Sequence, residues 1–100
     1  MNLIDKNISD INKLCETYKV NKLYAFGSVL KDKFNDDSDV DLIVDFKPID
    51  LYFYADNYFD FKFSLEDLLK RKIDLLEEKA IKNPYFMQVV NPEKQLVYAA

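Results

Sequence analysis

The sequence lacks histidine and has one glycine and one cysteine among its 100 residues. Without histidine, neither a Ser-His-Asp catalytic triad nor a histidine-containing zinc site can form. A single cysteine excludes a cysteine-based zinc cluster and an internal disulfide, and it fits a reducing, cytoplasmic environment. The single glycine excludes the GxxxxGK and GxGxxG phosphate-binding loops, which need two or more glycines. Any metal chemistry must therefore use oxygen ligands, which favour Mg²⁺ when phosphates complete its coordination.

Long apolar runs and an excess of basic residues are also missing. No uninterrupted apolar segment approaches the roughly 18 residues of a membrane span, and residues 1–10 lack the apolar core of a signal peptide. We therefore expect a cytoplasmic protein without membrane contact. The net charge of −4 argues against direct binding of long nucleic acid, which needs a basic face. A bound nucleotide must instead be neutralised locally, by metal ions or a few lysines.

Hydrophobic residues make up 49% of the chain, enough for a single folded domain over residues 1–100 with a modest core. Apolar residues recur at helical spacing over residues 3–17 and 51–71, which predicts two amphipathic helices. A further helix is expected to begin at Asn83-Pro84, and residues 94–98 read as a short tail. Short apolar runs predict strands at residues 23–26, 42–44 and 72–77.

The residues that point to chemistry lie within residues 23–45. The first strand leads into Gly27-Ser28, a helix is expected to begin at Ser28, and the next strand opens with Asp39 and Asp41. Ser28 offers a hydroxyl and a backbone N–H at a helix N-terminus, where phosphates bind; the alternative is an ordinary turn with Ser28 as N-cap. Because side chains two apart on a strand point the same way, Asp39 and Asp41 can share a metal site.

Four other charged residues bear on this site. Lys31 and Lys33, on the helix expected after the Gly-Ser pair, either contact a triphosphate or are simply solvated. Asp45 shares the strand parity of Asp41 but lies about 13 Å further along, too far to join two metals ~3.5–4 Å apart. Asp74 interrupts a later apolar strand. A buried, unpaired carboxylate is costly, so Asp74 is either paired or metal-bound, or partly exposed on an edge strand.

Residues 51–63 carry seven aromatic side chains, more than one stripe of a helix can bury. The residues at helical spacing that are expected to face the core are Leu51, Tyr54, Ala55, Tyr58 and Phe59. The aromatic residues left off this stripe are Tyr52, Phe53, Phe61 and Phe63. Two interpretations stay open for these four: a wide core face, or a surface that binds a partner.

The pattern GS-x10-D-x-D, at residues 27–41, is expected by chance in about one chain of this length in a thousand. Together with Asp74 on a later strand, it resembles the minimal nucleotidyltransferases (MNT type) of the DNA polymerase β-like superfamily. The resemblance covers about residues 20–98. It implies a polymerase β-like α/β (α+β) fold, in which a small mixed β-sheet backed by helices holds the site. Members of this family are known as antitoxin partners of HEPN-domain toxins.

The resemblance also implies roles for five residues. Gly27 and Ser28 would bind the nucleotide phosphates, and Asp39 and Asp41 would hold two Mg²⁺ ions. Asp74 would be the third carboxylate, which helps to bind the second metal and orients or deprotonates the acceptor hydroxyl. Some members carry an arginine directly after Gly-Ser, where this chain has a valine. Which residues of this chain bind the triphosphate therefore stays open.

The resemblance implies Mg²⁺-dependent transfer of AMP from ATP to a protein hydroxyl, specifically a tyrosine of a HEPN toxin, which would make the chain an antitoxin. Such a transfer needs in-line attack on the α-phosphorus and departure of pyrophosphate, and two metals stabilise both oxygens. One alternative is transfer to a small molecule, although relatives that do so usually carry an additional substrate-binding domain. Another is a non-catalytic antitoxin that neutralises its partner by binding alone.

Overall fold

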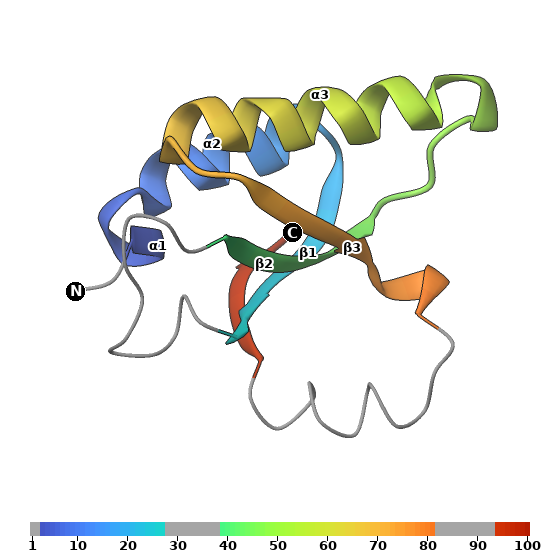
Figure 1. The fold of residues 1–100 in the computed structure, drawn as a ribbon. Coiled ribbons are helices and arrows are strands. Elements are labelled where there is room, and N and C mark those ends of the chain that lie inside the picture. Colours follow the sequence, from blue (N-terminus) through green and yellow to red (C-terminus); the bar gives the residue numbers. More distant parts are fainter. Residues whose placement is uncertain (1–2, 28–38, 82–93) are drawn as a thin grey trace.

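The structure is a computed structural model that describes residues 3–27, 39–81 and 94–100 (Figure 1). Ser28, Lys31, Lys33 and the helix expected at Asn83-Pro84 lie outside these residues. Its helices and strands, in chain order, are α1 (Leu3–Lys6), α2 (Ile8–Thr17), β1 (Val20–Phe26), β2 (Val40–Phe46), α3 (Leu51–Leu69), β3 (Ile73–Glu77), the 3₁₀ helix η2 (Glu78–Ala80) and β4 (Gln95–Ala99).

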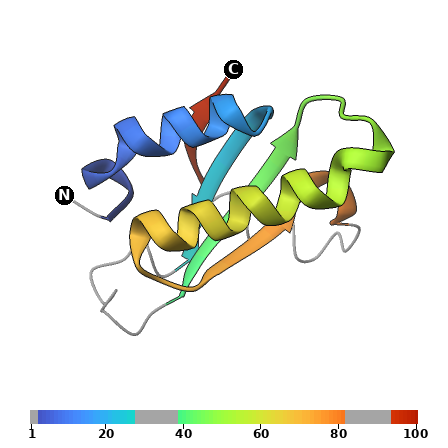
Figure 2. The ribbon, with the colours of Figure 1, turned by 90° about the horizontal axis from the view of Figure 1, so that it is seen from above.

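The four strands form one mixed sheet in the order β3-β2-β1-β4. β1 is antiparallel to both β2 and β4, whereas β2 and β3 are parallel. α2 and α3 lie on the same side of this sheet, which Figure 2 shows from above. This arrangement confirms the expected α+β fold with a small mixed sheet backed by helices.

The core lies between the sheet and the two longer helices. Along β2, Leu42 and Val44 are buried and point toward the helices, together with Val40 and Phe46. The ring of Phe46 meets that of Phe61 on α3 edge to face, with 5.9 Å between centroids. Because successive strand residues point to opposite faces, packing these apolar residues under the helices leaves Asp41 and Asp45 on the other face of the sheet.

α3 packs on the sheet through only part of the stripe that the spacing predicted: Tyr54 and Tyr58 pack against the core, as expected. Leu51 is 88% exposed and Phe59 48% exposed, whereas Phe61 is fully buried. The prediction was wrong for Leu51, Ala55 and Phe59 because it considered residues 51–63 alone. Over the whole helix, Phe61, Leu65 and Leu69 form an i, i+4 row that outweighs the shorter stripe. Among the described helices, α3 included, none has the length and apolar character needed to cross a membrane.

Two other elements differ from the prediction. The segment expected as a tail is a strand, β4, which pairs with the free edge of β1 (Leu23 with Tyr98, for example). This pairing joins residues far apart in sequence, so local patterns do not reveal it. The single helix expected over residues 3–17 is interrupted at Asn7, whose side-chain amide donates to the carbonyl of Leu3 at 2.9 Å.

Candidate active site

Gly27 and Asp41 lie against each other where β1 ends and β2 begins. Phe26, the last residue of β1, pairs with Asp41 in the antiparallel register. Gly27 has a φ of +75°, and a Cβ built on it would lie 2.8 Å from Oδ2 of Asp41. Real Cβ atoms do not approach an oxygen so closely, and side chains disfavour this φ. Because this residue is glycine, the only one in the chain, the backbone can approach the carboxylate of Asp41 this closely.

Asp74 lies beside Asp41 on the neighbouring strand. β2 and β3 run parallel with Asp41 opposite Asp74. Ile73 and Leu75, on either side of Asp74, are buried in the core, so Asp74 projects from the opposite face, as Asp41 does. The register thus brings together two carboxylates that are 33 positions apart in the chain. Asp74 is exposed and Asp41 is partly buried.

Asp39 completes the acidic group at this end of the sheet. It lies exposed, directly before β2. Burial raises the pKa of Asp41, and the negative charges of Asp74 and then Asp39 raise it further. Asp41 is therefore the centre of the group, since both of the other carboxylates act on it. A cation bound here would relieve this repulsion.

The carboxylates at this end of the sheet are suited to bind a divalent cation whose coordination a bound ligand completes. Their donors are all carboxylate oxygens, which suit Mg²⁺, and the missing Cβ of Gly27 leaves room beside Asp41. Within residues 3–27, 39–81 and 94–100, however, no three acidic or cysteine side chains are already gathered as metal ligands. Phosphate oxygens would have to supply part of the coordination.

A lysine that sequence reasoning did not consider lies on the same face of the sheet. Tyr24 pairs with Ile43 of β2, two residues beyond Asp41, and so shares its face. The ammonium of Lys94 lies 4.2 Å from the centroid of the Tyr24 ring, a cation–π distance. No local pattern marks this pair, because the pairing of β4 with β1 brings Lys94 to Tyr24. Lys94 adds a positive charge to the face that carries the carboxylates.

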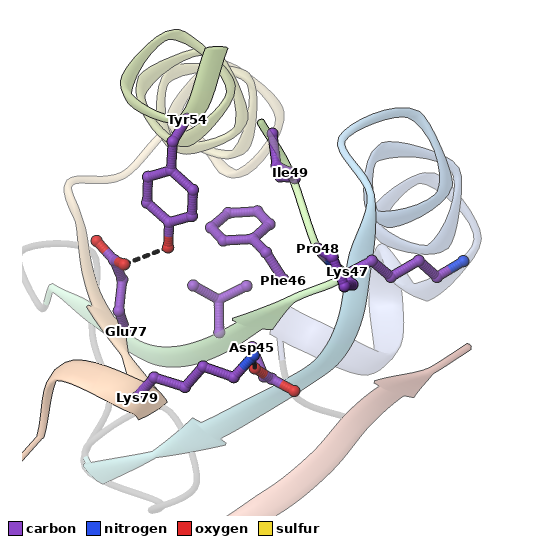
Figure 3. Close-up of a pocket in the computed structure, with 9 residues that line it drawn as sticks. Asp45, Phe46, Lys47, Pro48, Ile49, Tyr54, Glu77 and Lys79 are labelled. Carbon is purple, nitrogen blue, oxygen red and sulfur yellow. Dashed lines mark hydrogen bonds and ion pairs between the residues drawn. The ribbon is translucent and has the colours of Figure 1, made fainter. Parts of the chain in front are cut away.

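The other end of β2 holds a pocket of about 210 Å³ (Figure 3). There Asp45 accepts a hydrogen bond from the Asn21 amide at 2.9 Å, and its other oxygen lies 3.4 Å from the ammonium of Lys79. The hydroxyl of Tyr54 donates to Glu77. Burial, and then this hydrogen bond, raise the pKa of Tyr54. The acidic groups of this pocket are thus engaged by neighbouring side chains. The acids around Asp41 are the better candidates for chemistry.

Sequence comparison links the chain to nucleotidyl transfer. The family model "Polymerase beta, Nucleotidyltransferase" matches residues 9–100. A protein of Methanocaldococcus jannaschii, provisionally named a protein adenylyltransferase, is 36% identical over 85 residues, which cover 85% of this chain and 82% of the relative. A second protein with the same provisional name, from the same organism, is 35% identical over 89 residues, covering 86% and 83%.

Solved structures resemble this chain over nearly its whole length. A structure described provisionally as a minimal nucleotidyltransferase has a TM-score of 0.76 and 26% identity, and the match covers 95% of both chains. A toxin–antitoxin crystal structure with AMP-PNP has a TM-score of 0.71 at 21% identity, covering 94% of this chain and 74% of the other. A tri-AMPylated Shewanella oneidensis HEPN toxin in complex with an MNT antitoxin gives 0.65 at 20% identity, covering 97% and 73%. At these lower identities, the last two matches establish only that the fold is shared.

Proposed function

Because the chain belongs to the polymerase beta nucleotidyltransferase family, we propose that it transfers AMP from ATP to a hydroxyl group of a partner protein. One observation carries this proposal. Asp41 lies against the backbone of Gly27 and beside Asp74 on the next strand, so the glycine expected to approach the phosphates and two of the expected carboxylates meet at one end of the sheet. A cytoplasmic location, expected from the sequence, would supply ATP.

In this proposal, Asp39 and Asp41 hold two Mg²⁺ ions, and Asp74 contributes to the second. When bound, the metals would neutralise charge on the attacking and leaving oxygens. Gly27 offers a backbone without a side chain for close approach of the phosphates, and Ser28, which lies outside the described residues, keeps its expected phosphate-binding role. The ammonium of Lys94, on the carboxylate face, would offset part of the triphosphate charge.

The acceptor hydroxyl is oriented by Asp74, which also takes its proton. The hydroxyl oxygen then forms a bond to the α-phosphorus of ATP, while the bond from that phosphorus to the bridging oxygen breaks and pyrophosphate leaves. Asp74 is suited to this role because it is exposed at the edge strand of the sheet. A partner protein can therefore reach it, whereas Asp41 is partly covered.

We further propose that the acceptor is a tyrosine of a HEPN-type toxin and that the chain acts as its antitoxin. The structural likeness to chains of toxin–antitoxin complexes supports a toxin partner, and the relatives' provisional names support adenylylation of a protein. Mixing the purified chain with ATP, Mg²⁺ and a HEPN-type toxin from the same genome should add one or more AMP units to the toxin. Intact-mass spectrometry measures this addition. Loss of toxicity without any change in mass would instead establish neutralisation by binding alone.

ATP should bind this chain only with a divalent cation. The three carboxylates of Asp39, Asp41 and Asp74 repel a triphosphate unless a metal neutralises them. Calorimetry with ATP in EDTA, and then in excess Mg²⁺, measures the difference, which we expect to be about tenfold or more in Kd. As a control, Asp56→Asn, an exposed change on α3, should keep the full Mg²⁺ dependence. Equal affinity with and without Mg²⁺ would rule out a metal site here.

A further inference from the structure

The outer face of α3 carries two pairs of exposed aromatic rings. Tyr52 and Phe53 are 84% and 57% exposed, and Phe59 and Phe63 are 48% and 53% exposed. Within the pairs, the rings of Tyr52 and Phe53 meet edge to face at 5.1 Å, and those of Phe59 and Phe63 stack at 5.9 Å. We call these four residues the aromatic surface. Phe61, also considered for such a role, is buried and does not belong to it. Large aromatic surfaces exposed on one helix are typical of binding sites.

Most of the charged residues around the aromatic surface are acidic. Asp56, Asp60 and Asp67 are exposed on α3, and at helical spacing Asp56 and Asp60 lie beside Phe59 and Phe63. Residues 51–61 contain no lysine or arginine. Lys62, three residues after Phe59, is the one basic residue of α3. Because the three exposed aspartates outnumber it, this face combines aromatic side chains with a net negative charge.

The aromatic surface lies away from the proposed active site. α3 covers the face of the sheet that is packed with apolar residues (Figures 1 and 2), whereas Asp41 and Asp74 project from the opposite face. A partner bound to the outside of α3 would leave the carboxylates open to ATP and to an acceptor hydroxyl.

We propose that the aromatic surface of α3 docks a protein partner that presents apolar side chains flanked by lysines or arginines. Charge complementarity decides between this occupant and a second copy of the chain. In a symmetric contact through α3, Asp56 and Asp60 of one copy would meet the same acids of the other, which is unfavourable. The apolar side chains of a basic partner would contact the aromatic surface, and its lysines or arginines would pair with the aspartates of α3. Taking the HEPN-type toxin as this partner rests on the proposed function.

Binding of the HEPN-type toxin from the same genome, measured by calorimetry without ATP, tests the proposal. Phe59→Ser and Phe63→Ser should each weaken binding by about tenfold or more. The melting temperature should change little, because both rings are about half exposed. Leu96→Ser is the matched control, since Leu96 on β4 is 53% exposed but lies off α3. It should bind as the unaltered chain does.

The charge component has its own test. The double variant Asp56→Lys/Asp60→Lys keeps every aromatic ring. It should bind the toxin more weakly, and its affinity should rise as salt rises. For the unaltered chain, affinity should fall as salt rises. Unaltered binding by this variant and by both phenylalanine variants would overturn the docking surface, as would a toxin that does not bind the unaltered chain. A chain that is dimeric alone, and monomeric as Phe63→Ser, would replace the proposed occupant with a second copy.

These results separate docking from catalysis. If the toxin binds through α3 but gains no AMP, the docking surface is supported and the proposed transfer is contradicted. If the toxin gains AMP while the α3 variants bind and react normally, the transfer is supported and the docking surface is contradicted.

Discussion

Gly27→Ala is expected to reduce nucleotidyl transfer by about 100-fold or more, the scale of a catalytic group misplaced by about 1 Å. The added Cβ would lie 2.8 Å from Oδ2 of Asp41, so the carboxylate or the turn has to move. Either movement displaces a proposed metal ligand relative to the phosphates. The φ of +75° at this position also strains alanine, by about 1–2 kcal/mol, so the free energy of unfolding should fall as well.

Gly27→Asn separates the two effects. Asparagine tolerates positive φ better than alanine does, so it should recover part of the lost stability. It still carries a Cβ beside Asp41, so turnover should stay low. Steady-state rates with Mg²⁺-ATP and melting curves of both variants provide the measurement. Turnover near that of the unaltered chain in Gly27→Ala would show that close contact between Gly27 and Asp41 is not needed.

Asp74→Asn should change activity and stability in opposite directions. Turnover should fall by about 100-fold or more, because the change removes the proposed base and a proposed metal ligand. The metal-free protein should become more stable at neutral pH, by roughly 0.2–1 kcal/mol, the scale of a cross-strand pair. The gain is small because Asp74 is exposed and solvent screens its charge. ATP binding should survive better than turnover, since Asp39 and Asp41 remain.

The pH dependence of this gain has a definite sign. In the folded protein, burial and the charges of Asp74 and Asp39 raise the pKa of Asp41, so ionisation of Asp41 favours the unfolded chain. Below the ordinary pKa of aspartate, Asp41 is protonated in both states and Asp74→Asn brings no benefit. The benefit should appear as pH rises through that value and be complete above the raised pKa of Asp41. Melting curves without metal at pH 3 and pH 7 measure it, with Asp56→Asn as the control. Unchanged turnover in Asp74→Asn would remove Asp74 from the site.

Much of the acidic end of the sheet could be predicted because the rules involved are local. The alternation of strand residues places Asp39 and Asp41 on one face, and a lone glycine between a strand and a helix indicates close approach of the backbone. The resemblance to minimal nucleotidyltransferases, based on GS-x10-D-x-D and Asp74, is confirmed by the family match and the structural likeness. The roles of the five residues stay predictions, which the variants of Gly27 and Asp74 address.

The features that were missed depend on contacts between distant parts of the chain. The burial of Phe61 in place of Phe59 follows from Leu65 and Leu69, which lie beyond the aromatic segment and complete its row. β4 forms by pairing with the free edge of β1, and this pairing brings Lys94 over Tyr24. Periodicity within one segment cannot reveal which neighbour the segment will meet.

The alternation along β2 has a consequence for how such a protein can evolve. Val40, Leu42 and Val44 hold the helices, while Asp41, one residue away from two of them, belongs to the acidic group. Mutations on the outside of α3 are separated from the carboxylates by the whole thickness of the core. If the aromatic surface docks the partner as proposed, selection can alter that surface without altering the carboxylates. A duplicated copy could acquire a new partner before it lost its old reaction.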